Sequence, residues 1–288
     1  MENIAHSLLG ARIADLGWKE RMGPRATWIG VIAANLPDGD LLYSLVDADR
    51  GRWYHRGLTH SFFGWPIMAL LGAAVSRRVL GQGSYRDHLG LWAACLLSHA
   101  MLDWPTTWGT LLFFPVSDVR FSLDWIFIVD PMFWAILGGL AWRRRGVARG
   151  AIPIAILAGW MLFGGMMKQQ AIAQAPEKVE AWPAPLAPVF WTAVHTDSLT
   201  TRRYFLTPWS STPAGSWPTP AGANVDVVRR TRRGERWFWM ANAPVLRGEG
   251  RDGSVTLSDL AYTSWVDPDT FRFTVTLMPD GSERADGE

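Results

Sequence analysis

Two short stretches near the start of the chain concentrate side chains that bind metal ions. NLPDGD supplies Asp38 and Asp40, and HRGLTHS supplies His55 and His60 around a glycine. Imidazole nitrogens and carboxylate oxygens together form the usual ligand sets of zinc and related divalent ions. The two stretches therefore indicate a metal site. Taken alone, Pro-Asp-Gly-Asp is also ordinary turn chemistry, and His55 is also compatible with an exposed loop.

A third stretch, SHAMLDW, carries His99 and Asp103 in a segment predicted to be helical. Residues four positions apart share a helix face, so this imidazole and this carboxylate can reach one ion. An ordinary hydrogen-bonded pair on a helix has the same spacing. His6, in the first short helical segment, is a further candidate. The predicted metal ligands are His6, Asp38, Asp40, His55, His60, His99 and Asp103.

Three residues are predicted to act during a reaction. Arg56 stands beside His55 and is a natural partner for a phosphate or carboxylate group. Asp130 lies in the apolar run FIVDPMFW, where an ionised carboxylate needs a partner. It is interpreted as a ligand, an arginine partner or a general base. Asp38 is the other candidate for accepting a proton from water.

The composition places these residues in a chain that is part membrane protein and part soluble protein. Hydrophobic residues make up 49% of the 288 residues, and 18 residues are tryptophan, which favours the membrane–water interface. A tryptophan-rich core is the alternative. The net charge of +2 gives no indication of nucleic-acid binding. A single cysteine, Cys95, excludes an internal disulfide and a cysteine-based metal site.

Apolar segments predict a polytopic α-helical membrane domain over residues 1–170. Two short segments, 4–16 and 27–36, precede four longer ones at 62–80, 88–104, 123–142 and 150–167. Arginines after the first and third long segments place those loops in the cytoplasm by the positive-inside rule. The candidate ligands then gather near the outer face. We therefore expect a multi-pass membrane protein.

The character of the sequence changes after Met167. Residues 171–188 are rich in proline and alanine and are interpreted as a linker. Residues 189–280 contain short β-like runs separated by Gly, Pro and Asp: RYFLTPW, NVDVVRR, RWFWMA, SVTLSDL and FRFTVTL. They predict a small C-terminal β-rich extracytoplasmic domain. Residues 281–288 are expected to form a tail.

The motif series resembles bacterial inner-membrane proteins described as membrane-bound, metal-dependent hydrolases. An early histidine, P-D-x-D, H-R-G-x-T-H-S, H-x-x-x-D followed by T-x-x-G, and a later D-P occur in this order over residues 1–135. The resemblance implies a hydrolase that uses a divalent metal and that lies, as a multi-pass protein, in the bacterial inner (cytoplasmic) membrane. Zinc suits the His/Asp mixture best, with manganese or iron as alternatives. A site at the level of the lipid headgroups predicts a membrane lipid or a lipid-linked phosphoester as substrate.

Two other functions fit the same residues. Aspartate and histidine inside a membrane also mark the pathways of ion or proton transporters. Such transporters contain inverted repeats, and no repeat is evident in the sequence. The third possibility is a membrane scaffold that a metal stabilises and whose β-rich domain binds partners. A saturated metal shell would favour the scaffold, and an open coordination position beside Arg56 would favour the enzyme.

Overall fold

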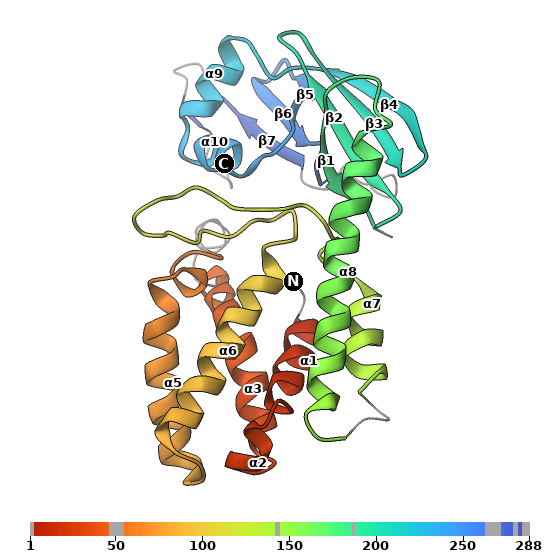
Figure 1. Ribbon diagram of the computed structural model, residues 1–288. Helices are drawn as coiled ribbons and strands as arrows, with labels where there is room; N and C mark the ends of the chain where they lie inside the picture. The colour runs from red at the N-terminus through yellow and green to blue at the C-terminus, as the bar shows by residue number, and fades with distance from the viewer. Residues whose placement is uncertain are drawn as a thin grey trace. The chain divides into compact units, whose positions relative to one another are not determined.

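The computed structural model describes residues 3–45, 55–141, 145–185, 188–262, 272–278 and 282–283. The chain forms two compact units, Met1–Gly165 and Met166–Glu288, and each is described by itself. Helix α8 (Ala148–Ile172) begins in the first unit and ends in the second (Figure 1). The segment predicted as a linker, 171–188, contains strand β1 (Glu180–Pro183). The predicted tail lies outside the described residues except for 282 and 283.

The first unit is helical. Before α8 it contains α1 (Asn3–Ala14), α2 (Trp18–Met22), α3 (Ala26–Asn35), η1 (Pro37–Leu45), η2 (Leu58–His60), α5 (Gly64–Leu80), α6 (Tyr85–Asp103), α7 (Pro131–Trp134) and η3 (Ala135–Gly139). Buried alanine and leucine side chains, including Ala5, Ala33 and Leu96, join these helices in one core. This packing brings the start of α1 near the ends of α3 and α6 (Figure 1).

Helices α1 and α3 pack closely because glycines meet at their crossing. A Cβ atom on Gly10 would lie 2.2 Å from the carbonyl oxygen of Gly30, so neither position accepts a side chain without a shift. Further along, Asn35 Nδ2 donates a hydrogen bond to Ser7 Oγ at 2.9 Å. These contacts hold His6, the neighbour of Ser7, beside the end of α3.

The prediction of a polytopic helical membrane domain is wrong. Among the residues that the structure describes, α8 alone is long and apolar enough to cross a membrane. A span needs about 20 apolar residues, whereas α5 has 17 and ends in Arg77-Arg78. The expected span 123–142 is interrupted: α7 has four residues, the π-helical turn η3 has five, and residues 122–130 contain no helix.

This failure has a physical cause. Apolar content within a window does not report whether the backbone forms one continuous helix or several short pieces. Helix α6 has 19 residues, but it carries charged and histidine side chains at both ends. The outer-face position of the site and the extracytoplasmic position of the C-terminal domain were both inferred from four spans, so both predictions lose their basis.

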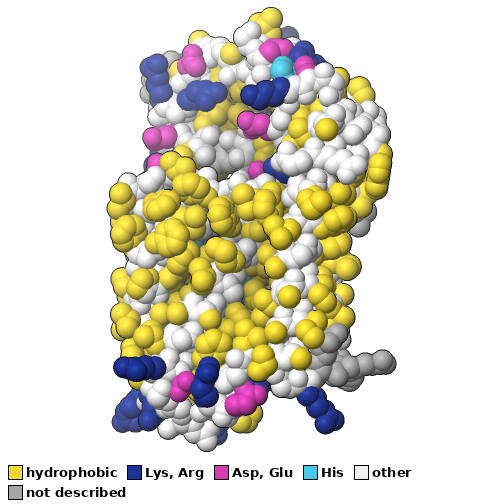
Figure 2. Space-filling model, in the orientation of Figure 1, with side chains coloured by type: hydrophobic (Ala, Val, Ile, Leu, Met, Phe, Trp, Pro, Cys, Tyr) yellow, Lys and Arg dark blue, Asp and Glu magenta, His cyan; other side chains and the backbone are white. Residues whose placement is uncertain are grey.

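Large apolar side chains nevertheless remain exposed on the first unit. On α5, Ile67, Leu71, Val75 and Val79 are each more than half exposed and follow one another along one face. Figure 2 shows hydrophobic side chains over much of the visible face of this unit, with lysine and arginine at one end. An exposed apolar surface of this kind marks contact with a membrane or with another protein.

The second unit contains two antiparallel sheets, with strand orders β1-β2-β3-β4 and β5-β6-β7. Besides β1, the strands are β2 (Trp191–Thr196), β3 (Thr200–Thr207), β4 (Ser210–Pro218), β5 (Pro244–Glu249), β6 (Ser254–Asp259) and β7 (Arg272–Thr276). Buried pairs fix the register: Trp191 lies opposite Leu206, and Val255 lies opposite Val275.

Two runs that were predicted as strands are helical. NVDVVRR falls in α9 (Ala223–Arg230), and RWFWMA falls largely in α10 (Arg232–Met240). Val225 and Val228 are both fully buried, and their spacing of three is a helical period. Thr231 caps α10 by accepting a hydrogen bond from the Gly234 N–H at 3.0 Å. These short-range signals identify helices, and the strand predictions for both runs were wrong.

Candidate metal centre

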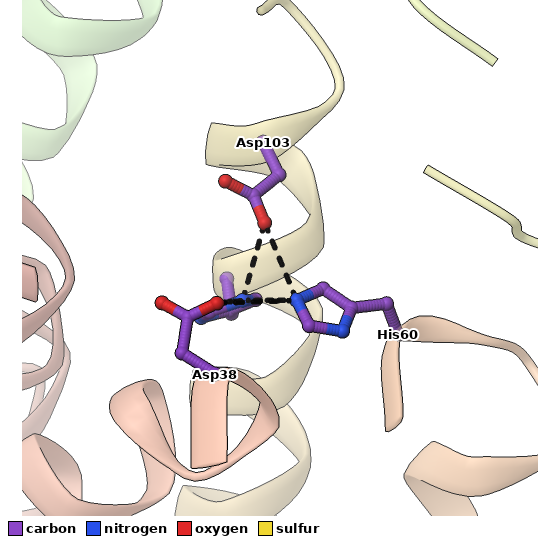
Figure 3. A group of neighbouring side chains, drawn as sticks. Asp38, His60 and Asp103 are labelled. Atoms are coloured by element: carbon purple, nitrogen blue, oxygen red, sulfur yellow. Dashed lines mark hydrogen bonds and ion pairs between the residues drawn. The ribbon is translucent and has the colours of Figure 1, made fainter. Parts of the chain in front are cut away.

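Four buried side chains in the first unit converge on one point. One ligand atom from each of Asp38, His60, His99 and Asp103 lies within 4.8 Å of the others. Asp38 comes from η1, His60 from η2, and the other two from the last turns of α6. Figure 3 shows Asp38, His60 and Asp103 directed toward the same position. Residues far apart in the sequence thus form one cluster.

The spacing of these atoms suits a tetrahedral ion. The Nε2 atoms of His60 and His99 are 2.9 Å apart. Asp38 Oδ1 lies 3.4 and 3.5 Å from these two nitrogens, and Asp103 Oδ2 lies 3.5 and 3.2 Å from them. A tetrahedral zinc ion with bonds of about 2.1 Å separates its ligand atoms by about 3.4 Å. The four residues therefore fit a single ion.

Hydrogen bonds on the far side of each imidazole fix which nitrogen faces the centre. His99 Nδ1 lies 2.7 Å from the carbonyl oxygen of Ala34. A carbonyl only accepts, so Nδ1 carries the proton and donates it, which leaves the Nε2 lone pair directed at the cluster. His60 Nδ1 lies 2.9 Å from Thr59 Oγ1 and 3.5 Å from Asp40 Oδ2. Histidines that bind metals are held in this way.

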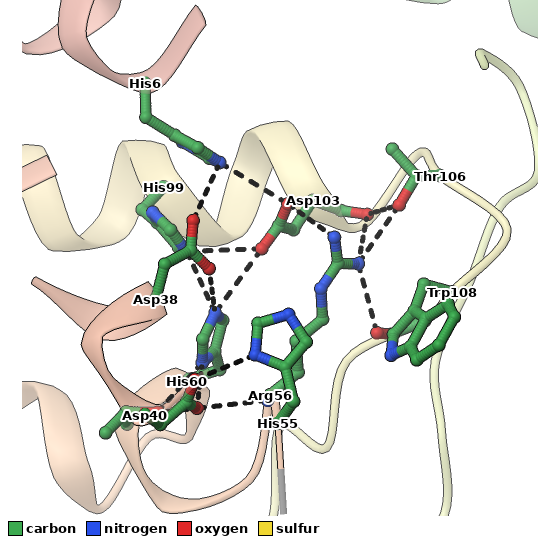
Figure 4. A network of polar contacts seen from close by, with 12 residues as sticks. His6, Asp38, Asp40, His55, Arg56, His60, His99, Asp103, Thr106 and Trp108 are labelled. Carbon is green, nitrogen blue, oxygen red and sulfur yellow. Dashed lines mark hydrogen bonds and ion pairs between the residues drawn. The ribbon is translucent and has the colours of Figure 1, made fainter. Parts of the chain in front are cut away.

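Asp40 and His55, which were predicted as ligands, lie on the Nδ1 side of His60. Asp40 Oδ1 is 2.7 Å from His55 Nδ1, and Asp40 Oδ2 accepts hydrogen bonds from Thr59 Oγ1 at 2.6 Å and the Arg56 N–H at 3.2 Å. The two nitrogens of an imidazole point in different directions. Asp40 and His55 therefore support His60 from behind and do not join the four converging atoms (Figure 4).

His6 approaches the cluster from α1. Its ring is fully buried and stacks on the His99 ring, with centroids 3.9 Å apart. His6 Nε2 lies 3.5 Å from Asp103 Oδ1 and 4.0 Å from Asp38 Oδ2. Burial, followed by the nearby His99, lowers the pKa of His6 to about 3. The imidazole is therefore neutral and able to bind a cation.

Arg56, predicted to hold a substrate anion, contacts the protein instead. Its guanidinium is buried, and Nη2 donates to Asp103 Oδ1 at 2.9 Å. Nη1 donates to Thr106 Oγ1 at 3.1 Å and to the Gly109 carbonyl at 3.2 Å. Its backbone φ of 64° is uncommon for a residue other than glycine. Arg56 thus orients Asp103 and the loop that follows it.

Asp130 is engaged elsewhere. It caps α7, because Oδ1 accepts a hydrogen bond from the Met132 N–H at 2.9 Å. Oδ2 accepts one from Trp160 Nε1 at 2.7 Å. Neither of these two hydrogen-bond donors belongs to the cluster of Asp38, His60, His99 and Asp103. The partners that this aspartate requires are a helix N-terminus and a tryptophan, so the structure does not bring Asp130 to the centre.

The net charge of the side chains in and around the cluster favours the binding of a cation. Asp38, Asp40, Asp103 and Arg56 together leave two negative charges when the imidazoles are neutral, and buried charge is costly unless compensated. Burial alone would lower the pKa of His60, but contacts with Asp103, Asp38 and Asp40 outweigh it and raise the pKa to about 10. The cluster therefore attracts positive charge.

Two contributors were not predicted from the sequence. The Ala34 carbonyl fixes His99, and Thr106 Oγ1 donates to the Asp103 carbonyl at 2.7 Å while accepting from Arg56. Thr106 has a signal in DWPTTWGT, where a hydroxyl follows the ligand by three positions. Ala34 has no signal, because any residue type at the end of α3 supplies a carbonyl.

All residues of the cluster lie in the part of the chain that matches a known protein family. The model of the YdjM inner membrane protein family matches residues 1–171, more than half of the chain, so the chain belongs to this family. Inner membrane protein YbcI of Escherichia coli (strain K12) is 32% identical over 150 residues, and the match covers 42% of this chain and 86% of YbcI. No solved structure matches the chain. The family supports an inner-membrane location, which agrees with the apolar α8 and the exposed apolar face of the first unit.

Proposed function

We propose that this protein is a metal-dependent hydrolase of the inner membrane that cleaves phosphoesters. The observation that carries the proposal is the convergence of two imidazole Nε2 atoms and two carboxylates, with each Nδ1 already occupied by a hydrogen bond. Zinc suits this ligand set, with manganese or iron as alternatives. When bound, such an ion lowers the pKa of a coordinated water to about 7 and polarises the scissile group.

The residues around the ion have distinct roles. His60, His99 and Asp103 are fully buried and would hold the ion. Asp38 is 7% exposed, and its Oδ2 atom has no hydrogen-bond partner. Asp38 would therefore both bind the ion through Oδ1 and accept, at Oδ2, the proton of the attacking water. Arg56 keeps Asp103 ionised and oriented. The reacting phosphoester belongs to a membrane lipid or to a lipid-linked molecule, because the family resides in the inner membrane.

The test is hydrolysis of bis(4-nitrophenyl) phosphate by the full chain in detergent. Activity should disappear after chelation and return when zinc or manganese is added. His60→Ala should lower it by at least about a hundredfold, since loss of a ligand exceeds the loss expected for a supporting residue. His195→Ala in the second unit is the matched control and should retain wild-type activity.

One observation favours a second function, a scaffold that the ion stabilises. The four ligand residues alone fill a tetrahedral shell, which is typical of structural zinc. In that case the metal-loaded protein would hydrolyse no phosphomonoester, phosphodiester or carboxylic ester, while chelation would still destabilise it. That combination of results would replace the hydrolase proposal with the scaffold.

A further inference from the structure

His6 and the outer oxygens of two ligand carboxylates form a separate group of atoms. Asp38 Oδ1 and Asp103 Oδ2 face His60 and His99. The other oxygen of each carboxylate faces His6 Nε2, at 4.0 Å for Asp38 Oδ2 and 3.5 Å for Asp103 Oδ1. Figure 4 shows this division, with His6 on one side of the two carboxylates and His60 on the other. Each carboxylate therefore presents one oxygen to each side.

We propose that these three atoms form a second position for a divalent cation, and that this position fills together with a phosphate group. The inference rests on the proposed function, because Asp38 and Asp103 bridge the two positions. Two ligand atoms up to about 4.2 Å apart can share an ion whose bonds are about 2.1 Å. Both distances from His6 Nε2 satisfy this limit. Waters and substrate oxygens would complete the shell.

The state of His6 points to a ligand. The residue is 0% exposed, and neither Nδ1 nor Nε2 has a hydrogen-bond partner. Buried polar side-chain atoms in proteins are almost always hydrogen-bonded, so a packing role does not explain this histidine. A cation on Nε2 supplies the missing partner for that atom. Arg56 Nη2 donates to Asp103 Oδ1 at 2.9 Å and so orients this carboxylate toward the group.

The stacking of two histidines sets the distance between the positions. The rings of His6 and His99 are nearly parallel, with an interplanar angle of 18° and centroids 3.9 Å apart. Parallel imidazoles that each bind one ion place the two ions at about the ring separation. Two-metal phosphatases and nucleases hold their ions about 3.5–4 Å apart. The stack of His6 on His99 therefore matches a two-ion centre.

Charge explains why the second position needs an anion. One divalent ion already neutralises the two excess negative charges of the aspartates and Arg56. A second ion creates an excess of two positive charges in a buried site, which is unfavourable without a partner. A phosphate dianion bound in the same site would offset that positive charge. With a second ion in place, Asp38 Oδ2 would be a ligand of that ion instead of the acceptor for the proton of the attacking water.

The experiment counts ions with and without phosphate. The full chain in detergent is stripped, titrated with Mn²⁺ and followed by calorimetry and electron paramagnetic resonance. The wild type should bind about one ion alone and about two with inorganic phosphate present, and a spin-coupled pair signal should appear at the second equivalent. His6→Ala and the gentler His6→Gln should stop at one ion and show no coupled signal. His195→Ala should behave like the wild type.

Each other outcome has a definite meaning. One ion in the wild type and in both His6 variants, with or without phosphate, overturns the second position and leaves the single-ion hydrolase standing. Two ions in both His6 variants overturn the assignment of His6. Absence of ions in every protein overturns the proposed function and the second position together. Circular dichroism of each variant shows whether its fold is intact.

Discussion

The buried Asp259 of the second unit and the aspartates of the metal cluster in the first unit are compensated in different ways. In the second unit, Asp259 is 2% exposed and accepts hydrogen bonds from three backbone N–H groups, those of Asn242, Ala243 and Ala261, at 2.8, 2.9 and 3.0 Å. In the first unit, Asp38 and Asp103 face imidazoles, and the Arg56 guanidinium pairs with Asp103.

Glu177 is a second acidic residue of the second unit whose charge is compensated by neighbouring protein groups. It receives two hydrogen bonds from Arg202, at 2.9 and 2.8 Å, and one from the Tyr204 hydroxyl at 2.5 Å. The second unit thus compensates both of these acids with its own groups. The first unit leaves an excess of negative charge around two imidazoles that point inward. The difference teaches that a buried carboxylate alone does not indicate a metal, whereas several buried carboxylates that face oriented imidazoles form a possible metal site.

Metal removal should produce the largest difference in stability between the two units. Chelation should destabilise the last turns of α6 by about 4 kcal/mol relative to protein with free ion at about a thousand times its Kd. Hydrogen exchange of the full chain measures this, and amides near His99 should exchange faster while those of β2 and β3 stay unchanged. Equal changes in both units, or no change in either, would remove the proposed contrast.

Loss of Asp259 should have the converse effect. Asp259→Ala leaves three buried N–H groups without their acceptor, which should destabilise the second unit by about 3 kcal/mol. Exchange of β6 amides measures the destabilisation, and elemental analysis measures the metal. The metal content should stay at the wild-type value. A loss of metal in this variant would contradict the assignment of the ion to the first unit.

Asp40 tests the support behind His60. Asp40→Asn removes a negative charge beside His60 Nδ1, so His60 becomes a weaker ligand and the cluster a weaker attractor for cations. We expect the affinity for zinc to fall by about 10- to 100-fold without a change in stoichiometry, measured by competition with a chelating dye. Glu177→Gln, the matched change in the second unit, should leave the affinity unaltered. Equal affinities in wild type and Asp40→Asn would show that Asp40 is not a supporting residue.

The smallest effect concerns pH. Hydrogen bonds from Arg202 and Tyr204 lower the pKa of Glu177 to about 2. Because the folded pKa lies below the unfolded one, this stabilisation is present above about pH 4.5 and is lost as the pH falls toward 2. The difference in unfolding between wild type and Glu177→Gln should shrink over that range, equally with and without chelator. A difference that persists at pH 2 would contradict the role of the ionised carboxylate.

Much of the candidate site could be anticipated from residue types and spacing. His99 and Asp103 are four apart on a continuous helix, so their meeting at 3.2 Å follows from helical geometry. His60 stands beside Thr59, whose hydroxyl contacts its ring nitrogen. Spacing could not show which of the seven candidates converge, because that depends on how α1, η1 and α6 pack together.

The rest required the fold. Arg56 was predicted to face a substrate, and only the packing of the loop 104–109 shows that it serves Asp103. The Ala34 carbonyl carries no sequence signal. The four-span topology failed because hydropathy describes the composition of a segment and does not report breaks such as the one before α7. Helices α9 and α10 were misread because aromatic and valine residues favour strands, while the packing of Val225 and Val228 selects a helix.

The most direct test of the metal centre is elemental analysis of the full chain purified in detergent, with wild type, His60→Ala and His195→Ala prepared side by side. We predict at least one equivalent of zinc or manganese in the wild type and in His195→Ala, and almost none in His60→Ala. Equal metal in all three proteins, or none in the wild type after supplementation, would contradict the metal centre formed by Asp38, His60, His99 and Asp103.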